Sequence, residues 1–525
     1  MKIEESTLKE YNSRRPEHAR SLACHAPFTA LNFEQGGNVT ACCYNRTFVL
    51  GKYPENNLNE IWFGEKAKEL KKYIEQNDFS HGCELCARQI NSHNFEGSRA
   101  KGFDTYAEVP KPPTTKQKIQ EVFGIKRKVY PKVLEFEIDN TCNLECVMCN
   151  GKFSSLIRKN RENLPPIPNP YDDEFVEQIK PFLPHLEEAK FLGGEPFLTP
   201  LFYKIWDAIA EINPKIRVYI TTNGTVLTQK VKDVLEKLNI NLIISIDAIS
   251  KDVYESIRIN ANYEKVMENI SFYYNYSKIK GTQFSFSSCP MTNNWFDIPN
   301  LLNYANNLDL PLFFNTVLNP KELSFSSLKY RELKKIVEEY ESFKFPNEVK
   351  NLSKNQNAFK DLINYLKTIL EDRAISIEHF KKFKKYLEKP EDDLKELARL
   401  YLFAQELVTG EGEFKNEDIL NEKLEGLTKD YVEKETIEKS VSQITSLILE
   451  YCKTQLNEKQ FENAQNVLNG LIHFSTADQK NAISVLFGIM KTEIRYVING
   501  ISSIKPEEVS KLIFSEYVSG VYKEF

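Results

Sequence analysis

Short apolar runs alternate with amphipathic segments from residue 133 to residue 318. Six of these runs have the length and composition of strands: 133–139, 188–194, 216–224, 240–248, 282–290 and 310–318. The segments between them, such as PLFYKIWDAIAEI, place apolar residues at helical spacing. Strands separated by helices predict βαβ units and a parallel sheet. We therefore expect an α/β fold, a partial (βα)6 TIM-like barrel over residues 132–324, with its chemistry at the carboxyl ends of the strands.

The segments that flank this barrel have different compositions. Residues 1–103 are rich in cysteine, with a hairpin predicted at 31–42 and a helix at 58–76, which indicates a small α+β domain. Residues 104–131 contain Pro110, Pro112 and Pro113, which break regular structure, and lead into the basic run KRKVYPK, which is typical of a linker. Residues 325–525 are rich in Lys and Glu and poor in glycine, so we expect a mostly helical region. That region is either a module that binds a partner or substrate, or structural packing.

The charge balance and hydropathy exclude several classes of protein. Lys plus Arg number 69 and Asp plus Glu number 74, so the net charge of −5 argues against nucleic acid as the main partner. No run of 18 apolar residues exists, and we expect no membrane partner. The charged start, MKIEESTLKEYNSRR, lacks the apolar core of a signal peptide, which predicts a cytoplasmic protein. Cysteines in that compartment are reduced, so a disulfide framework is not expected.

Ten cysteines are present, and eight of them lie within the first 149 residues. Cys142, Cys146 and Cys149 follow the first predicted barrel strand in a C-x3-C-x2-C spacing. Three thiolates on one loop can hold three irons of a cubane cluster and leave the fourth iron open. A structural zinc site would need a fourth ligand and would close. Taken alone, the triplet leaves zinc or a chance spacing as the alternative.

The other predicted strand ends carry polar or glycine residues. FLGGEP ends the second strand, TTNGT the third and SIDA the fourth, and VYESIR follows the fourth. Because the carboxyl ends of parallel strands form one face of a barrel, we expect these motifs to converge near the three cysteines. The residues singled out there are Gly193, Gly194, Glu195, Asn223, Ser245, Asp247 and Arg258.

This set of motifs, in this order, resembles the radical S-adenosylmethionine (SAM) enzymes over residues 132–320. The resemblance implies that the three cysteines bind a [4Fe-4S] cluster whose open iron chelates SAM. It also implies that the reduced cluster cleaves SAM to methionine and a 5′-deoxyadenosyl radical, which removes a hydrogen atom from the substrate.

The resemblance assigns roles to individual residues. Gly193, Gly194 and Glu195 would contact the methionine amino group, Ser245 the carboxylate or ribose, and Arg258 the carboxylate. Glu195 is thereby expected to contact the cofactor rather than to act as a catalytic base. Met148 stands where the family often has an aromatic residue, and it would pack against adenine. The remaining residues assigned to cofactor binding are Asn223 and Asp247.

A second set of cysteines lies upstream: Cys24, Cys42, Cys43, Cys83 and Cys86. Their surroundings resemble the SPASM and twitch auxiliary-cluster domains in four features: a cysteine before a proline, a Gly-x-Val hairpin, a Leu-x-Glu-Ile-Trp helix and a closing C-x2-C. The resemblance implies a second, closed [4Fe-4S] cluster in an N-terminal module, with either Cys42 or Cys43 among its four ligands. A zinc ribbon is the alternative. His25, His81 and His93 are less favoured as ligands.

The leading hypothesis is a radical SAM enzyme that abstracts hydrogen from a peptide or protein side chain or α-carbon, because auxiliary-cluster domains recur in peptide maturases. A small-molecule substrate, such as a sugar or nucleotide derivative, is one alternative. A non-catalytic iron–sulfur binding protein is the other. A flavodoxin or ferredoxin is the expected electron donor.

Overall fold

The computed structural model describes residues 2–91, 95, 98–107, 128–345 and 352–387, the last sixteen of these by their backbone alone. The chain divides into two compact units. The first comprises Met1–Leu323 and Phe345–Ala358, and the second comprises Ser324–Lys344 and Phe359–Phe525. Each unit is described by itself below.

The first unit contains a nine-stranded sheet with the order β3-β2-β1-β4-β5-β6-β7-β8-β9. All neighbours from β1 through β4 to β9 run parallel. The six predicted barrel strands are present as β4 to β9: Val133–Glu137, Glu188–Phe191, Arg217–Thr222, Ile240–Ser245, Phe284–Ser288 and Leu312–Phe314. The predicted α/β fold with a parallel sheet is thus confirmed.

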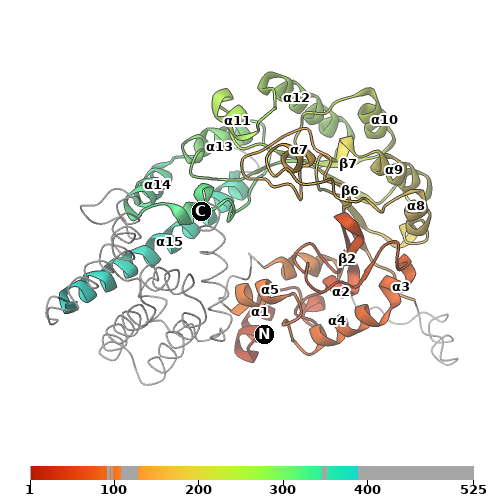
Figure 1. The fold of residues 1–525 in the computed structure, drawn as a ribbon, viewed down its shortest axis with the longest axis horizontal. Helices are drawn as coiled ribbons and strands as arrows, with labels where there is room; N and C mark the ends of the chain where they lie inside the picture. Colours follow the sequence, from red (N-terminus) through yellow and green to blue (C-terminus); the bar gives the residue numbers. More distant parts are fainter. Residues whose placement is uncertain (1, 92–94, 96–97, 108–127, 346–351, 388–525) are drawn as a thin grey trace, which may run out of the picture. The chain divides into compact units, whose positions relative to one another are not determined.

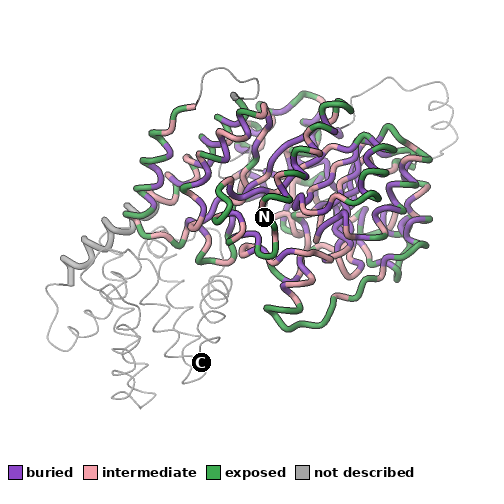
Figure 2. The backbone as a smooth tube through the Cα atoms, turned by 90° about the horizontal axis from the view of Figure 1, so that it is seen from above, coloured by how far each residue is buried: buried purple, intermediate pink, exposed green. Residues whose placement is uncertain are grey.

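Apolar side chains on one face of the sheet hold the covering helices. Phe136 of β4 stacks on Phe191 of β5 with ring centroids 4.9 Å apart, and Phe191 contacts Trp206 of α9. Figure 1 shows the helices in an arc along this side, and Figure 2 shows buried stretches of the chain with exposed stretches outside them. These helices are α8 Asp173–Ile179, α9 Pro200–Ile212, α10 Gln229–Lys237, α11 Lys251–Ile257, α12 Tyr263–Lys280 and α13 Ile298–Asn307.

Alternate residues of the same strands give the opposite face a polar character. Glu135 and Glu137 of β4 are almost fully buried there, and Glu135 is in register with Lys190 of β5. Because side chains alternate along a strand, the residues that pack the helices cannot also line this face. The polar face is therefore the one available to a site.

The cysteine-rich segment belongs to the same sheet as the barrel strands. Strand β1 (Ala30–Glu34) pairs in parallel with β4, and the predicted hairpin is confirmed as β1 with β2 (Asn38–Thr40). Strand β3 (Gly51–Lys52) completes this edge. The expected division of residues 1–131 into a separate cluster domain and a linker therefore stays a prediction, since no break in the sheet marks it. Of the predicted linker, residues 108–127 lie outside the described residues.

The remaining N-terminal elements are helical. The single helix predicted at 58–76 is instead two helices, α3 (Leu58–Phe63) and α4 (Glu65–Glu75). Gly64 lies between them in an extended conformation, where an added Cβ would stand 2.2 Å from the Glu60 carbonyl oxygen. The other helices here are α1 Glu5–Ser13, α2 Ala26–Thr29, α5 Glu84–Asn91 and the 3₁₀ helix η3 Arg99–Tyr106.

The described part of the region after residue 324 is helical, as predicted. It contains α14 (Tyr330–Ser342) and α15 (Leu352–Leu387). Residues 388–525, on which the rest of that prediction falls, lie outside the described residues. Among the helices that the structure describes, none combines the length and apolar character needed to cross a membrane.

Candidate functional site

The three cysteines of the C-x3-C-x2-C motif lie on the loop between β4 and α7 (Ser155–Asn160), at the carboxyl end of β4. The loop is fixed by hydrogen bonds rather than by regular structure. The Cys142 N–H donates to Ser155 Oγ at 3.2 Å, and the Val147 N–H donates to the Ile257 carbonyl at 2.9 Å. The end of α11 thus holds the loop at its middle, between Cys146 and Cys149.

Gly193 and Gly194 allow the loop after β5 to approach the cysteine loop closely. The Gly194 N–H donates to the Asp139 carbonyl at 3.1 Å, and the Glu195 N–H donates to the Thr141 carbonyl at 2.7 Å. An added Cβ at Gly194 would stand 2.2 Å from the Thr141 oxygen, and Gly193 has a positive φ of 92°. Any side chain at these two positions would push the loops apart.

We predict that Gly194→Ala weakens SAM binding by at least about tenfold, because overpacking against backbone costs about 1–3 kcal/mol and moves the cysteine loop. Isothermal titration of the iron-loaded protein with SAM measures the change. Gly102→Ala is the matched control, since its nearest contact would be the end of the Arg99 side chain at 3.9 Å. Equal affinities for the Gly194→Ala variant and the wild type would contradict the close approach.

The Glu195 side chain links the loop after β5 to the end of β6. It is fully buried, and its carboxylate accepts hydrogen bonds from Thr222 Oγ1 at 2.8 Å, from the Asn223 N–H at 2.8 Å and from the Phe197 N–H at 3.1 Å. Burial raises the pKa of Glu195 to about 7, against the lowering effect of these donors. Both oxygens are thus engaged within the chain.

Asn223 joins the end of β6 to the cysteine loop. Its side-chain N–H donates to Asn143 Oδ1 at 3.1 Å, and Asn143 in turn donates to Thr225 Oγ1 at 2.9 Å. The same amide nitrogen lies 3.9 Å from Cys142 Sγ. The asparagine therefore sits directly beside the first cysteine of the motif, as the convergence of strand ends predicts.

Arg258 and Asp247 form a buried ion pair, which the sequence did not predict. Arg258 Nη2 lies 2.8 Å from Asp247 Oδ2, and the two side chains are 7% and 0% exposed. Burial lowers the pKa of Arg258, but the Asp247 carboxylate, together with the nearby Cys146, Tyr254 and Cys289 side chains, holds that pKa above its usual value. Arg258 Nε is buried without a hydrogen-bond partner among the described residues, so one donor remains for another group.

Two further predicted residues lie at the same end of the sheet. Ser245 is the last residue of β7 and is half-buried, in register with Ser287 of β8. Met148 packs with Cys289 against a small apolar cluster around Ile257 and Met291. Cys289 follows β8 directly, and its N–H donates to Asp247 Oδ1 at 2.7 Å.

Burial also sets the state of the three thiols. It raises the pKa of Cys142 to about 12 and that of Cys149 to about 11, and it raises that of Cys146 as well. The thiols are therefore protonated near neutral pH when no metal is present. Because only the thiolate is a metal ligand, loading of this loop releases protons.

The upstream cysteines gather around a pocket of about 390 Å³, counting its opening to solvent. The thiol-bearing residues that line it are Cys24, Cys42, Cys83 and Cys86. Cys43 is not among the lining residues; burial, and next to it the Glu135 carboxylate, raises the Cys43 pKa to about 12. Of the two cysteines between which the sequence left the ligand open, Cys42 lines the pocket and Cys43 does not.

Other polar groups of this module are engaged elsewhere. Asn45 Nδ2 lies 3.2 Å from Cys83 Sγ and donates to the His81 carbonyl at 3.0 Å. His25 Nε2 lies 2.9 Å from the Ala19 carbonyl, and the His81 ring stacks on Tyr73. Neither histidine lines the pocket. The third candidate, His93, lies outside the described residues.

The described residues contain no three His, Cys, Asp or Glu side chains close enough to share one metal ion. A zinc site would require such a group, with ligands about 2.0–2.3 Å from a single ion. Thiolates that hold a cubane cluster bind its separate irons.

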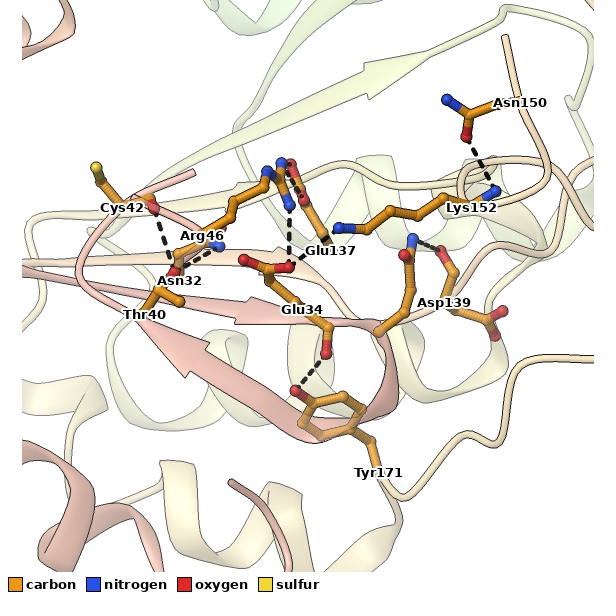
Figure 3. Close-up of polar contacts among 11 residues, drawn as sticks. Asn32, Glu34, Thr40, Cys42, Arg46, Glu137, Asp139, Asn150, Lys152 and Tyr171 are labelled. Atoms are coloured by element: carbon orange, nitrogen blue, oxygen red, sulfur yellow. Dashed lines mark hydrogen bonds and ion pairs between the residues drawn. The ribbon is translucent and has the colours of Figure 1, made fainter. Parts of the chain in front are cut away.

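A cluster of four charged residues joins the two cysteine-bearing loops (Figure 3). Arg46 lies 2.8 Å from Glu137 Oε2 and 3.3 Å from Glu34 Oε2, and Lys152 lies 3.2 Å from the same Glu34 oxygen. Arg46 follows Cys43 by three residues and Lys152 follows Cys149 by three. Sequence reasoning missed this link, although two glutamates at predicted strand ends were a signal for it.

Comparison with known proteins identifies both cysteine-bearing segments. Residues 136–283 match the model of the Radical SAM superfamily. The chain carries a radical SAM domain. Residues 24–88 match the SPASM iron–sulfur cluster-binding domain, which confirms the predicted N-terminal position of this module. A [4Fe-4S] cluster with SAM, and an auxiliary iron–sulfur cluster, are the cofactors of these two domains.

Curated relatives match about a quarter of the chain. The chain is 27% identical over 147 residues to a GTP 3′,8-cyclase of Streptomyces coelicolor, a match that covers 26% of this chain and 39% of the relative. It is 28% identical over 129 residues to an AdoMet-dependent heme synthase of Methanosarcina barkeri, covering 24% of this chain and 34% of the relative. The chain thus spans about two-fifths or less of these relatives.

Two solved structures with bound S-adenosylmethionine are also similar. Native anSMEcpe with bound AdoMet gives a TM-score of 0.32 at 21% identity, covering 39% of this chain and 59% of the other. Streptococcus suis SuiB bound to S-adenosylmethionine gives a TM-score of 0.32 at 14% identity, covering 52% of this chain and 61% of the other.

Proposed function

We propose that this protein cleaves SAM reductively and uses the resulting radical to abstract a hydrogen atom from a peptide or protein substrate. The observation that carries the proposal is the convergence of the cysteine loop with the ends of β5, β6 and β7. The Gly193–Gly194 approach and the Asn223 contact beside Cys142 place this loop at the carboxyl ends of parallel strands. Barrel enzymes build their active sites there.

The residues present fit the cofactors of a radical SAM domain. Cys142, Cys146 and Cys149 would hold the cluster. A cluster bound there would supply the one electron that cleaves SAM to methionine and a 5′-deoxyadenosyl radical. Because the Glu195 carboxylate is engaged with β6, we assign the contact with the methionine amino group to the backbone of residues 193–195.

The other cofactor contacts follow from the free groups near the loop. The partnerless Nε–H of Arg258 would donate to the SAM carboxylate while its Nη2 stays on Asp247. Asp247 thereby positions the guanidinium rather than the cofactor itself. Ser245 and Asn223 contact the cofactor from the ends of β7 and β6, and Met148 packs against adenine.

The auxiliary cluster is held by the cysteines that line the pocket, with Cys42 and not Cys43 as the second ligand. Four thiolates close that cluster, so it offers no open iron to a second SAM molecule. A flavodoxin or ferredoxin supplies the electrons. The protein acts in the cytoplasm, without nucleic acid or a membrane.

The SPASM domain supports a peptide substrate. Its resemblance to auxiliary-cluster domains implies such a substrate, because these domains recur in peptide maturases. The GTP 3′,8-cyclase relatives support the alternative of a nucleotide derivative, although each match covers only 26% of this chain. The peptide and nucleotide alternatives therefore predict that different compounds are consumed in the reaction.

A single experiment separates these substrates. The iron-loaded protein is incubated anaerobically with SAM, dithionite and either GTP or a short peptide encoded beside its gene. We expect a change in the peptide mass, measured by mass spectrometry, and no loss of GTP. Consumption of GTP with every peptide unchanged would replace the peptide proposal with the nucleotide one.

A further inference from the structure

Arg99 occupies one side of the auxiliary-cluster pocket. It is the first residue of η3 and lines the pocket together with the four cysteines. Its Nη2 lies 2.6 Å from Glu135 Oε1 of β4. Its Nε is buried and has no hydrogen-bond partner among the described residues. Arg99 thus lines the pocket with one hydrogen-bond donor, its Nε–H, not used by any described residue.

The charge of Arg99 is not cancelled by its partner. Glu135 also accepts from Lys190 at 3.2 Å, Lys190 lies 3.1 Å from Glu188, and Glu188 lies 3.3 Å from Arg217. This row of five charges crosses β4, β5 and β6 and sums to +1. Glu135 and Glu188 are 2% and 8% exposed, whereas Arg99 is 30% and Arg217 is 45% exposed, so water screens Arg217 at the far end most. Because Lys190 shares the Glu135 carboxylate, the charge that faces the pocket is that of the Arg99 guanidinium, only partly offset by Glu135.

We propose that Arg99 sets the reduction potential of the auxiliary cluster by donating its Nε–H to a sulfur of the cluster and by placing this charge beside it. Reduction adds one electron and no proton, so it adds one negative charge to the site. A nearby cation and a hydrogen bond to sulfur both stabilise that charge and raise the potential. Arg99 thus makes the cluster a better electron acceptor, and Glu135 holds the guanidinium in place while weakening its effect.

The test uses the full chain with Cys142, Cys146 and Cys149 replaced by alanine, so that only the auxiliary cluster is titrated. The electron paramagnetic resonance signal of the reduced cluster is measured in dithionite titrations at defined potentials. At the midpoint potential of the parent, Arg99→Met should lower the ratio of reduced to oxidised cluster by about tenfold, which is about 59 mV for one electron. This readout does not depend on SAM cleavage, so it stands apart from the proposed activity.

Two further variants make the result decisive. Glu135→Gln should raise the same ratio, because it removes the opposing charge, and Arg99→Lys should fall between the parent and Arg99→Met. Arg88→Met is the matched control, since Arg88 is an exposed cation on α5, the helix that carries Cys86. An Arg99→Met ratio within twofold of the parent would overturn the proposal, and so would an equal fall in Arg88→Met. Should Arg99→Met fail to hold a cluster, an unchanged ratio in Glu135→Gln would overturn it instead.

Discussion

Replacing Cys142, Cys146 and Cys149 with alanine should abolish formation of 5′-deoxyadenosine and leave about four of about eight irons per chain. The three thiols are the metal-binding groups of the loop that meets the ends of β5 and β6, so their loss removes the cluster that binds SAM. The auxiliary pocket is built by other residues and keeps its own cluster. Iron analysis and chromatography of the SAM products measure both effects.

Cys43→Ala is the matched control for this variant. Cys43 is partly exposed and does not line the pocket, so its replacement should leave about eight irons and the wild-type yield of 5′-deoxyadenosine. A parent protein with one zinc and about four irons per chain would contradict the auxiliary cluster and support a zinc ribbon. A fall to about four irons in Cys43→Ala would instead make Cys43 the ligand in place of Cys42.

Replacing Cys83 and Cys86 with alanine should abolish substrate turnover while SAM is still cleaved. The two residues supply half of the pocket thiols, and the apolar cluster that contains Cys24, Cys42 and Cys86 also packs α1 and η3. Metal binding and folding are coupled in small metal-dependent modules, so this module should lose its order. The radical SAM loop is held from the ends of β5, β6 and α11, and it should keep its cluster.

The products of this variant distinguish three cases. We expect 5′-deoxyadenosine without modified substrate, with about four irons retained. Substrate modification at the wild-type rate would show that the auxiliary cluster is dispensable. Loss of both clusters would show that the two parts fold as one unit, an outcome that the pairing of β1 with β4 makes physically reasonable.

The strands and the motifs at their ends could be predicted because their signals are local. The alternation in VLEFEID and the glycines of FLGGEP each lie within a few residues, and the fold placed them where βαβ geometry requires. The SPASM position followed from short-range features as well. The break at Gly64 was missed because the apolar spacing continues across it, although glycine is a known interruption.

Contacts between distant segments left no local signal. Strands β1 and β4 pair in parallel across about a hundred residues of sequence, and nothing in LNFEQ or VLEFE specifies the partner. The same is true of the Arg258–Asp247 ion pair. Arg258 was predicted as a cofactor contact, and the structure shows that one side of its guanidinium already binds Asp247. The proposal that Cys42 rather than Cys43 is a ligand likewise rests on the pocket, because neighbouring residues on a chain point in different directions.

The most direct test of the central claim is anaerobic incubation of the iron-loaded protein with SAM and dithionite, followed by quantification of 5′-deoxyadenosine and methionine. The account predicts that both products form in equal amounts, and that neither forms in the variant without Cys142, Cys146 and Cys149. Intact SAM after incubation with fully loaded protein would contradict it.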